Sequence, residues 1–289
     1  MKLAQFLIAA ALSLLSVTVN AQSSASVSNG ASSQRLLREY ATADNFRAFA
    51  LQAKARPGEG GIFYANYVAN LCGREYSVIA QRGNAAIAKH IDATGTIPSW
   101  QLAKIEYLPR RCSGFLAGEA HALVNELKRV SVTSDPLLAA EKDLRTAARS
   151  GGRDQIRSAM ARAMEIDDPL LWTSQRLWDV VAQSDTEAKK SLGFYLGGVV
   201  YSEKDGLKHL EAYTALELGF CKPDLPCALD DELSIICAIG GACAQDRDAK
   251  AKSLYLDNGG SEEGWKKVLT LVAQVRTALA TRNVAFFVR

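Results

Sequence analysis

The sequence lacks most features by which membrane proteins and nucleic-acid-binding proteins are recognised. Beyond the first residues, no hydrophobic stretch approaches the ~18 to 20 residues that a membrane-spanning helix needs. Lys and Arg number 34 against 31 Asp and Glu, and a net charge of +3 gives no basic field that would indicate nucleic acid. With 48% hydrophobic and 22% charged residues, the chain has an ordinary globular composition, neither disordered nor collagen-like.

Motifs that identify a reaction are missing as well. The sequence contains no His-Glu-x-x-His metal motif, no Gly-x-Ser-x-Gly nucleophile elbow, no phosphate-binding Gly-x-x-x-x-Gly-Lys loop and no Rossmann fingerprint. Only three histidines occur, and we expect His90, His121 and His209 to be surface or capping residues of helices. No catalytic residue, metal site or cofactor is therefore assigned.

Paired carboxylates are the remaining route to catalysis, because a glycosidase that cuts cell-wall sugar needs an acid and a base roughly 5 to 9 Å apart. The densest acidic run, Asp230–Glu232, opens a helix, where the helix dipole alone favours acids. Asp167 and Asp168, before Pro169, have the same explanation. Nothing in the sequence brings together the acids of the N-terminal half, Glu39, Glu75 and Glu119.

The first 21 residues have the pattern of a secretory signal peptide. Lys2 provides the positive charge, Leu3–Leu15 form a short apolar core, and Val19-Asn20-Ala21 places small residues before a cleavage site. We therefore expect residues 1–21 to be removed, so that the mature chain begins at Gln22 and is periplasmic or secreted.

Residues 22–33 are rich in serine and too polar to order themselves, so we expect them to form a flexible leader. From residue 34 on, the spacing of apolar residues is that of helices. Apolar residues recur on one helix face in three segments: Ile62–Cys72, Leu116–Val130 and Trp265–Leu279. No segment of useful length alternates polar and apolar residues as a half-buried strand does. The sequence therefore predicts one all-α domain over residues 34–289, built of stacked antiparallel helix hairpins and held by disulfides.

The C-terminal segment has two further features. Ser261 is the expected N-cap of the last helix, with Glu262 and Glu263 in its first turn. The run Val284–Val288 is the one candidate strand, and we expect it to pack back onto the last helices.

An internal echo, that is, a short sequence repeat, supports the prediction of helix hairpins. Asp135–Leu138 recurs 33 residues later as Asp168–Leu171, and Asp at the N-cap with Pro at the first helical position is a sound helix start. At the same offset Leu144 aligns with Leu177, so both are predicted to be core residues. Two helices per ~33 residues is the period of α-hairpin solenoids. Because Asp-Pro is a common helix start, a chance coincidence is the alternative.

Six cysteines in a chain predicted to be exported indicate disulfides. Cys72 ends one expected helix and Cys112 begins another. Both are far in sequence from the other four cysteines, so we pair these two with each other. A reactive thiolate is the alternative for Cys112, because Arg110 and Arg111 precede it, but the disulfide is favoured.

The other four cysteines lie close together in the sequence. We favour the local pairs Cys221 with Cys227 and Cys237 with Cys243, because crossed pairs would join opposite ends of a helix about 12 Å long. The crossed pairs remain alternatives. A structural zinc site is a further one, although zinc ligands usually have two to four residues between them and here there are five, with no histidine in the cluster.

Part of the chain resembles a known repeat family. Thr146–Gly152 and Ala188–Tyr195 are similar to pieces of a tetratricopeptide-type repeat of the Sel-like subclass, which has an alanine pair, a glycine turn and Leu-Gly with an aromatic residue. The resemblance covers residues 135–200 and implies stacked hairpins. The half of the chain that contains the clustered cysteines also resembles a class of uncharacterised exported helical proteins of Gram-negative bacteria, which implies a compartment and a fold but no activity.

Aromatic residues offer a binding surface. Two groups are expected on helices: Phe63, Tyr64 and Tyr67, and Phe194, Tyr195 and Tyr201. Core packing explains most such residues, but stacked hairpins present a concave face that typically binds peptides or proteins. We choose Tyr195 as the binding residue because it lies in the expected second helix of the second hairpin.

These observations lead to one expectation and one alternative. We expect an exported binding module without catalysis, whose partner is an envelope protein or a peptide, with no nucleic acid and no membrane span. The alternative is a cell-envelope hydrolase that acts on peptidoglycan with acidic residues as acid and base.

Overall fold

The computed structural model describes four stretches of the chain, residues 34–75, 95–130, 134–191 and 193–289. The predicted signal peptide and leader, residues 1–21 and 22–33, lie outside them. Helices dominate the described stretches, and their strands form one short hairpin, so the all-α fold class is confirmed. Within the same stretches, no helix combines the length and the apolarity that crossing a membrane requires.

The N-terminal part contains a helix over residues 34–42, α3 (Phe46–Lys54), the 3-10 helix η1 (Pro57–Glu59), α4 (Gly61–Asn70), the π-helix η2 (Leu71–Glu75), α6 (Ser99–Cys112) and α7 (Glu119–Leu127). Asn45 caps α3 by accepting from the Ala48 amide at 3.0 Å. In contrast, the N-cap of α4 is Gly60, which has no side chain that could accept from the helix amides. The first residue of α4, Gly61, must be glycine, because a Cβ there would stand 1.8 Å from the carbonyl oxygen of Ala53 on α3.

Two predicted helices of this part exist with shifted ends. The helix over Ile62–Cys72 corresponds to α4, which passes into η2 at Leu71. The helix over Leu116–Val130 corresponds to the shorter α7. It begins only after Gly118, whose φ of 78° lies in the left-handed region that glycine adopts easily, and it leaves Leu116 73% exposed in the preceding turn.

The middle of the chain contains α8 (Pro136–Ser150), α9 (Arg153–Ile166), the 3-10 helix η4 (Pro169–Leu171), α10 (Ser174–Gln183), α11 (Thr186–Lys190), β1 (Phe194–Leu196) and β2 (Val199–Tyr201). Asp135 caps α8 as predicted, accepting from the Leu138 amide at 2.9 Å. The strands are antiparallel with Tyr195 opposite Val200. Gly197 and Gly198 make the turn with φ of 58° and 92°, the left-handed values that a two-residue hairpin favours.

The C-terminal part contains the 3-10 helix η5 (Glu203–Asp205), α12 (Leu207–Phe220), α13 (Ala228–Ala238), α14 (Arg247–Asp257), α15 (Glu262–Ala280) and the 3-10 helix η6 (Val284–Phe286). The predicted helix over Trp265–Leu279 is confirmed as α15, and Ser261 caps it by accepting from the Gly264 amide at 3.0 Å.

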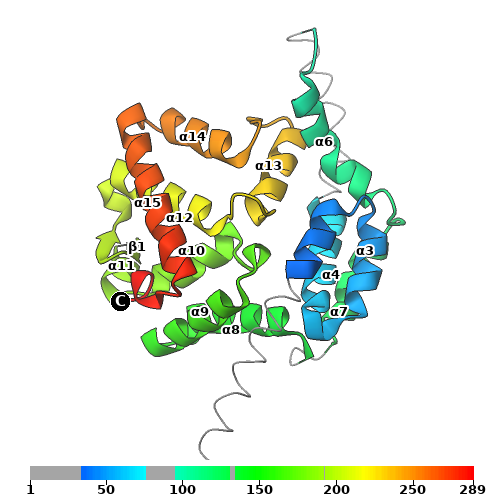
Figure 1. The fold of residues 1–289 in the computed structure, drawn as a ribbon, viewed down its shortest axis with the longest axis horizontal. Coiled ribbons are helices and arrows are strands. Elements are labelled where there is room, and N and C mark those ends of the chain that lie inside the picture. Colours follow the sequence, from blue (N-terminus) through cyan, green and yellow to red (C-terminus); the bar gives the residue numbers. More distant parts are fainter. Residues whose placement is uncertain (1–33, 76–94, 131–133, 192) are drawn as a thin grey trace, which may run out of the picture.

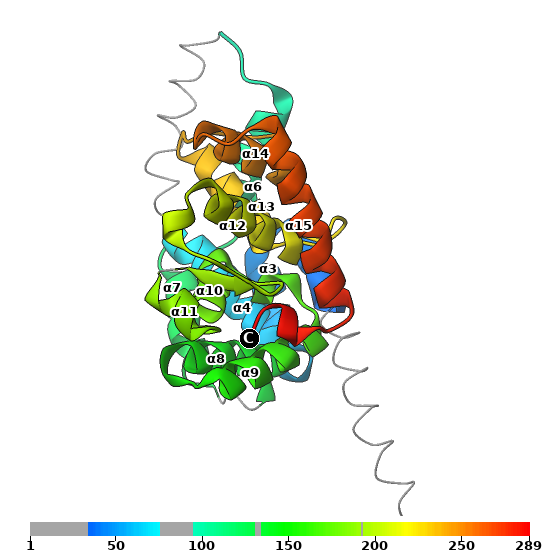
Figure 2. The ribbon, with the colours of Figure 1, turned by 90° about the vertical axis from the view of Figure 1, so that its left-hand side faces the viewer.

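The helices surround one main hydrophobic core, which extends from Leu36 in the first described helix to Val288 near the C-terminus. In Figure 1, α3, α4 and α7 form one side of the molecule and α12 packed on α15 forms the other. The pair α8 and α9 lies along the lower edge, and α13 packs on α6 near the upper edge. The perpendicular view keeps α8 and α9 as a layer beneath the other helices (Figure 2).

The two segments related by the internal echo differ in structure. The first forms the complete hairpin of α8 and α9, and Leu144 is buried as predicted. In the second, Asp168 caps only the short 3-10 helix η4, and the second helix, α11, has five residues. The side chain of Leu177 lies outside the described residues.

The prediction of a helix that carries Phe194, Tyr195 and Tyr201 is wrong, because these residues lie in the β-hairpin. Gly193 passes so close to β2 that a Cβ would stand 2.0 Å from the carbonyl oxygen of Tyr201. Glycine and β-branched valine, both poor helix formers, flank the aromatic residues and favour the hairpin.

The C-terminal tail packs back onto α15 and α9, but not as a strand. Val284–Phe286 form η6, because the amides of Phe286 and Phe287 bond to carbonyls within the tail instead of a neighbouring strand. Its link to the hairpin is the bond from the Gly197 amide to the Phe286 carbonyl, at 2.8 Å. The Phe287 ring lies 5.3 Å from that of Phe220 on α12 and is fully buried.

All six cysteines form disulfides, and the pairs are those that the spacing favours. Cys72 is joined to Cys112 across 40 residues, which ties η2 to the end of α6. The local pairs Cys221–Cys227 and Cys237–Cys243 flank the two ends of α13. No free thiol remains, so neither a thiolate at Cys112 nor a zinc site in the cluster is present.

Candidate functional site

A hollow of about 540 Å³ opens between α4, α7 and α8. Its walls are apolar and polar in similar measure, and the apolar side chains are Ile62 and Phe63 of α4, Val124 and Leu127 of α7 and Leu138 of α8. Its volume lies within the roughly 300 to 1,000 Å³ of typical ligand sites. These three helices supply most of the lining, and Leu71 of η2 and Lys128 and Val130 after α7 complete it.

The polar groups of this hollow lie on α4 and α8. Asn66 and Asn70 on α4 are linked to each other, since the Asn70 amide group donates to the Asn66 backbone carbonyl at 2.7 Å. On α8, Glu141 is almost fully buried and accepts from Arg145 at 2.7 Å, whereas the Arg145 side chain is 53% exposed. Glu141 therefore fixes one end of a guanidinium group that faces solvent.

Two further hollows continue the first one along α8. One, of about 330 Å³, shares Leu138, Glu141 and Arg145 with it and adds Lys142 and Arg149. The other, of about 270 Å³, shares Arg145 and Arg149 and reaches Asp179 and Val180 on α10. Arg145 borders all three hollows, and we call their combined lining along α8 the α8 groove.

Behind the α8 groove, α4 is joined to the C-terminal half by a buried carboxylate. Tyr67, which lines the groove, donates its hydroxyl to Asp231 on α13 at 2.7 Å. Tyr40 donates to both oxygens of the same carboxylate, at 2.8 and 2.7 Å. Burial raises the pKa of Asp231 to about 6, against the two tyrosine hydrogen bonds and the charge of Arg111, which lower it. Burial also raises the pKa of both tyrosines, which therefore stay protonated donors.

A second and a third buried carboxylate also hold α4. Tyr64 donates to Asp168 at 2.6 Å, and burial raises the pKa of Asp168 to about 6. Asp135 accepts from the amides of Ile62 and Phe63 at 2.7 and 3.1 Å, in addition to capping α8. Burial raises its pKa as well. Asp135 thus supplies from α8 the cap that the N-terminus of α4 lacks.

Arg111 on α6 holds the edge of this network. It is 2% exposed, donates its Nε to the Ala43 carbonyl at 2.6 Å and also bonds to the Tyr40 carbonyl and the Tyr107 hydroxyl. Its guanidinium carbon lies 4.0 Å from the centre of the Phe46 ring. The cation is therefore satisfied by backbone and aromatic faces and takes part in packing, not in an open site.

The structure places Tyr195, the binding residue chosen from the sequence, away from the α8 groove. It lies on β1, half-buried, and does not line any of the three hollows. Of the histidines, His121 is exposed on α7, and His209 packs its ring 5.2 Å from that of Phe194. His90 lies outside the described residues.

The acids considered from the sequence are not brought together at an open site. Glu39 pairs with Arg56, and Glu119 pairs with Arg47 at 2.7 Å. Asp231 and Asp168 are buried, and neither lines the α8 groove. The side chain of Glu75 lies outside the described residues. In the part of the chain that the structure describes, no group of three or more His, Cys, Asp or Glu side chains could hold a metal ion.

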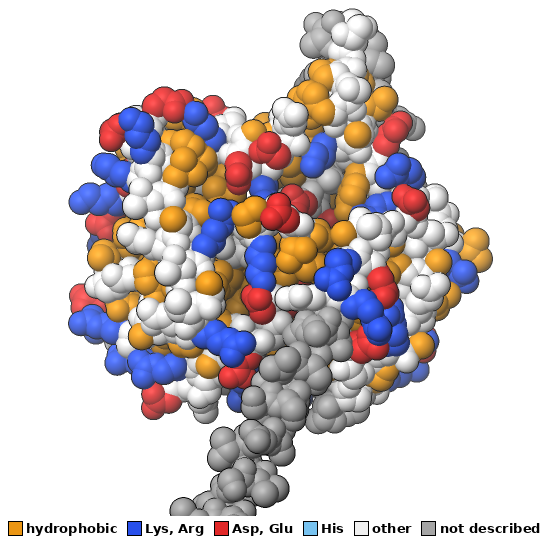
Figure 3. Space-filling view, viewed as in Figure 1, with side chains coloured by type: hydrophobic (Ala, Val, Ile, Leu, Met, Phe, Trp, Pro, Cys, Tyr) orange, Lys and Arg blue, Asp and Glu red, His pale blue; other side chains and the backbone are white. Residues whose placement is uncertain are grey.

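Surface charge elsewhere is mixed. On the face drawn in Figure 3, Lys and Arg are interspersed with Asp and Glu, without a broad field of one sign.

Comparisons with protein-family models, curated proteins and solved structures find no match to this chain.

Of the aromatic residues that the sequence suggested as a binding surface, Phe63 and Tyr67 line the α8 groove, whereas the sequence did not indicate its polar residues on α8. The Glu141–Arg145 spacing of four residues is a signal that predicts an ion pair on one helix face. No sequence signal separates Asp231, which turns inward, from Asp230, which caps α13 and pairs with Arg247 at 2.9 Å.

Proposed function

We propose that this protein is an exported, non-catalytic binding module that holds a peptide segment, free or part of an envelope protein, in the α8 groove. The observation that carries the proposal is the groove itself. It extends from a hollow of about 540 Å³, with apolar and polar walls, along the cations of a single helix. An elongated surface of this kind suits an extended segment better than a compact metabolite.

Export is supported by the signal-peptide pattern of residues 1–21 and by the three disulfides, which persist in oxidising compartments such as the periplasm. No observation on the described residues favours the peptidoglycan hydrolase, because the carboxylates with raised pKa are buried and bonded to tyrosines or, at Asp135, to backbone amides.

The test is selection from a random library of displayed peptides, with the selected peptides then measured by fluorescence polarisation. Asn66→Trp places an indole in the groove from the half-buried face of α4 and should abolish binding. Gln274→Trp, the matched change on the exposed face of α15, should leave binding unchanged. Circular dichroism should show that both variants keep their helical content.

Two results would argue against the proposal. If Tyr195→Ala weakened binding while Asn66→Trp did not, the β-hairpin and not the α8 groove would be the binding surface. If purified protein released soluble fragments from peptidoglycan, the protein would be a hydrolase and the non-catalytic assignment would be wrong.

A further inference from the structure

The α8 groove has an excess of positive charge. Among the described residues it is bordered by four cations, Lys128, Lys142, Arg145 and Arg149, and by two carboxylates, Glu141 and Asp179. Three of the cations lie on one helix and three or four residues apart, so they project from the same face of α8.

Two acids near the groove pair with cations outside it. On α8, Asp143 pairs with Arg162 of α9 at 2.9 Å. On α7, Glu126 pairs with Lys54 of α3. Lys142 and Arg149 form no ion pair with a described residue, which leaves their charges directed to solvent along the groove.

Charged and apolar side chains alternate along the groove. Around Leu138, the apolar side chains of Val124 and Leu127 stand beside Lys128 and Arg145. Lys142 and Arg149 follow one to three turns along α8. Eleven residues of helix separate Leu138 from Arg149, which is about 16 Å at 1.5 Å per residue. An extended peptide covers that length with about five residues.

We propose that the α8 groove binds an acidic peptide segment in an extended conformation, with an apolar side chain between α4 and α7 and carboxylates against Lys142, Arg145 and Arg149. This rests on the proposed function and specifies the ligand class of the same site. Glu141 acts as a positioning residue, because its bond to Arg145 leaves the rest of that guanidinium group aimed at the ligand.

The first experiment uses fluorescein-labelled peptides with two leucines, two serines and three glutamates in that order. Matched probes carry glutamine for glutamate, or serine for leucine. Exposed ion pairs contribute about 0.2 to 1 kcal/mol each, so three of them should make the acidic probe bind about tenfold more tightly than the glutamine probe. The advantage should shrink as NaCl is raised from 0.05 to 0.5 M.

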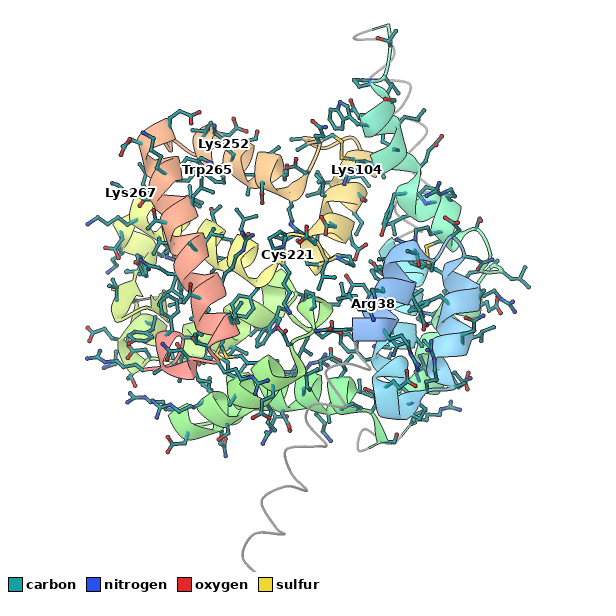
Figure 4. The ribbon with its side chains drawn as sticks, in the orientation of Figure 1. Arg38, Lys104, Cys221, Lys252, Trp265 and Lys267 are labelled. Carbon is teal, nitrogen blue, oxygen red and sulfur yellow. A yellow bond between two sulfur atoms is a disulfide. The ribbon has the colours of Figure 1, made fainter. Side chains whose placement is uncertain are left out.

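The second experiment removes the cations. The double variant Lys142→Gln with Arg149→Gln should lose about fivefold in affinity for the acidic probe and nothing for the glutamine probe. Its matched control, Lys266→Gln with Lys267→Gln, removes the same charge from exposed positions on α15 and should change neither value. Figure 4 shows Lys267 on the outer side of α15, well separated from α8.

Equal affinity for the acidic and glutamine probes would overturn this inference, as would equal affinity for the acidic probes with and without leucine. Failure of this inference differs from failure of the proposed function. Peptides selected from the random library without an excess of Asp and Glu would overturn the acidic ligand class but leave the binding function standing. If the library yielded no binding peptide at all, both would fall.

Discussion

Lowering the pH from 7.5 to 5 should make the protein more stable, the opposite of what ion-paired acids usually cause. The reason lies in Asp168 and Asp231, which are almost fully buried and accept hydrogen bonds from tyrosine hydroxyls. Burial raises the pKa of each to about 6, whereas the same carboxyl has a pKa of 3.8 when exposed. At neutral pH the folded protein therefore holds two buried carboxylates in their charged form, although burial favours the protonated, neutral form.

The sign and size follow from proton linkage. Between pH 3.8 and about 6 the folded state binds more protons than the unfolded state, so the free energy of unfolding rises as the pH falls through that range. Each pKa difference corresponds to roughly 3 kcal/mol, part of which is gained by pH 5. Below pH 3.8 the gain should reverse, because the hydrogen bonds that lower the pKa of Glu39 (from Arg56) and of Glu119 (from the Leu116 amide and Arg47) are then lost.

Urea unfolding followed by circular dichroism at pH 7.5, 6 and 5 measures this directly. Asp231→Asn keeps an acceptor for the tyrosine hydroxyls but cannot ionise, so its stability should rise only about half as much over the same range. Glu119→Gln removes a carboxyl from an exposed ion pair and should leave the rise intact. Stability that falls steadily from pH 7.5 to 5, or equal slopes for the native protein and Asp231→Asn, would refute the reasoning.

Four shorter predictions concern stability and processing. Asp135→Ala leaves two buried α4 amides and the α8 cap without an acceptor and should cost about 2 to 5 kcal/mol in urea unfolding. Leu144→Ala should cost roughly 2 to 5 kcal/mol by the same assay, because the side chain is buried. Cys72→Ser with Cys112→Ser should lose about 4 kcal/mol, with chemical unfolding as the readout. Intact-mass measurement of exported protein should find Gln22 as its first residue.

The local part of the fold was predictable from the sequence. Helix periodicity and caps depend on neighbouring residues, so α15 with its cap at Ser261, and α8 with its cap at Asp135, follow from short patterns. The local disulfides follow from spacing for the same reason. The β-hairpin of β1 and β2 was missed because Tyr195 and its neighbours were assigned to a helix by analogy with the helix hairpin of α8 and α9. Their own glycine and valine content favours strands.

The candidate site was not predictable, because it depends on distant contacts. Asp230 and Asp231 are adjacent and both occupy the first turn of α13, yet one caps the helix and the other enters the core. Only the position of Tyr40 and Tyr67, which come from the other end of the chain, decides between them. The α8 groove likewise requires α4, α7 and α8 to be placed in space.

Because the N-terminus of α4 is capped by Asp135 of a later segment, α4 cannot be completed until that segment has been made. As synthesis proceeds from the N-terminus, α4 emerges with no cap of its own, and Asp135 follows 73 residues after Ile62. The acceptor for Tyr67 of α4, Asp231, comes 164 residues after that tyrosine. A growing chain therefore carries α4 as an unfinished helix until most of the protein has been made. Folding should then be slow and close to all-or-none, since long-range contacts must form together.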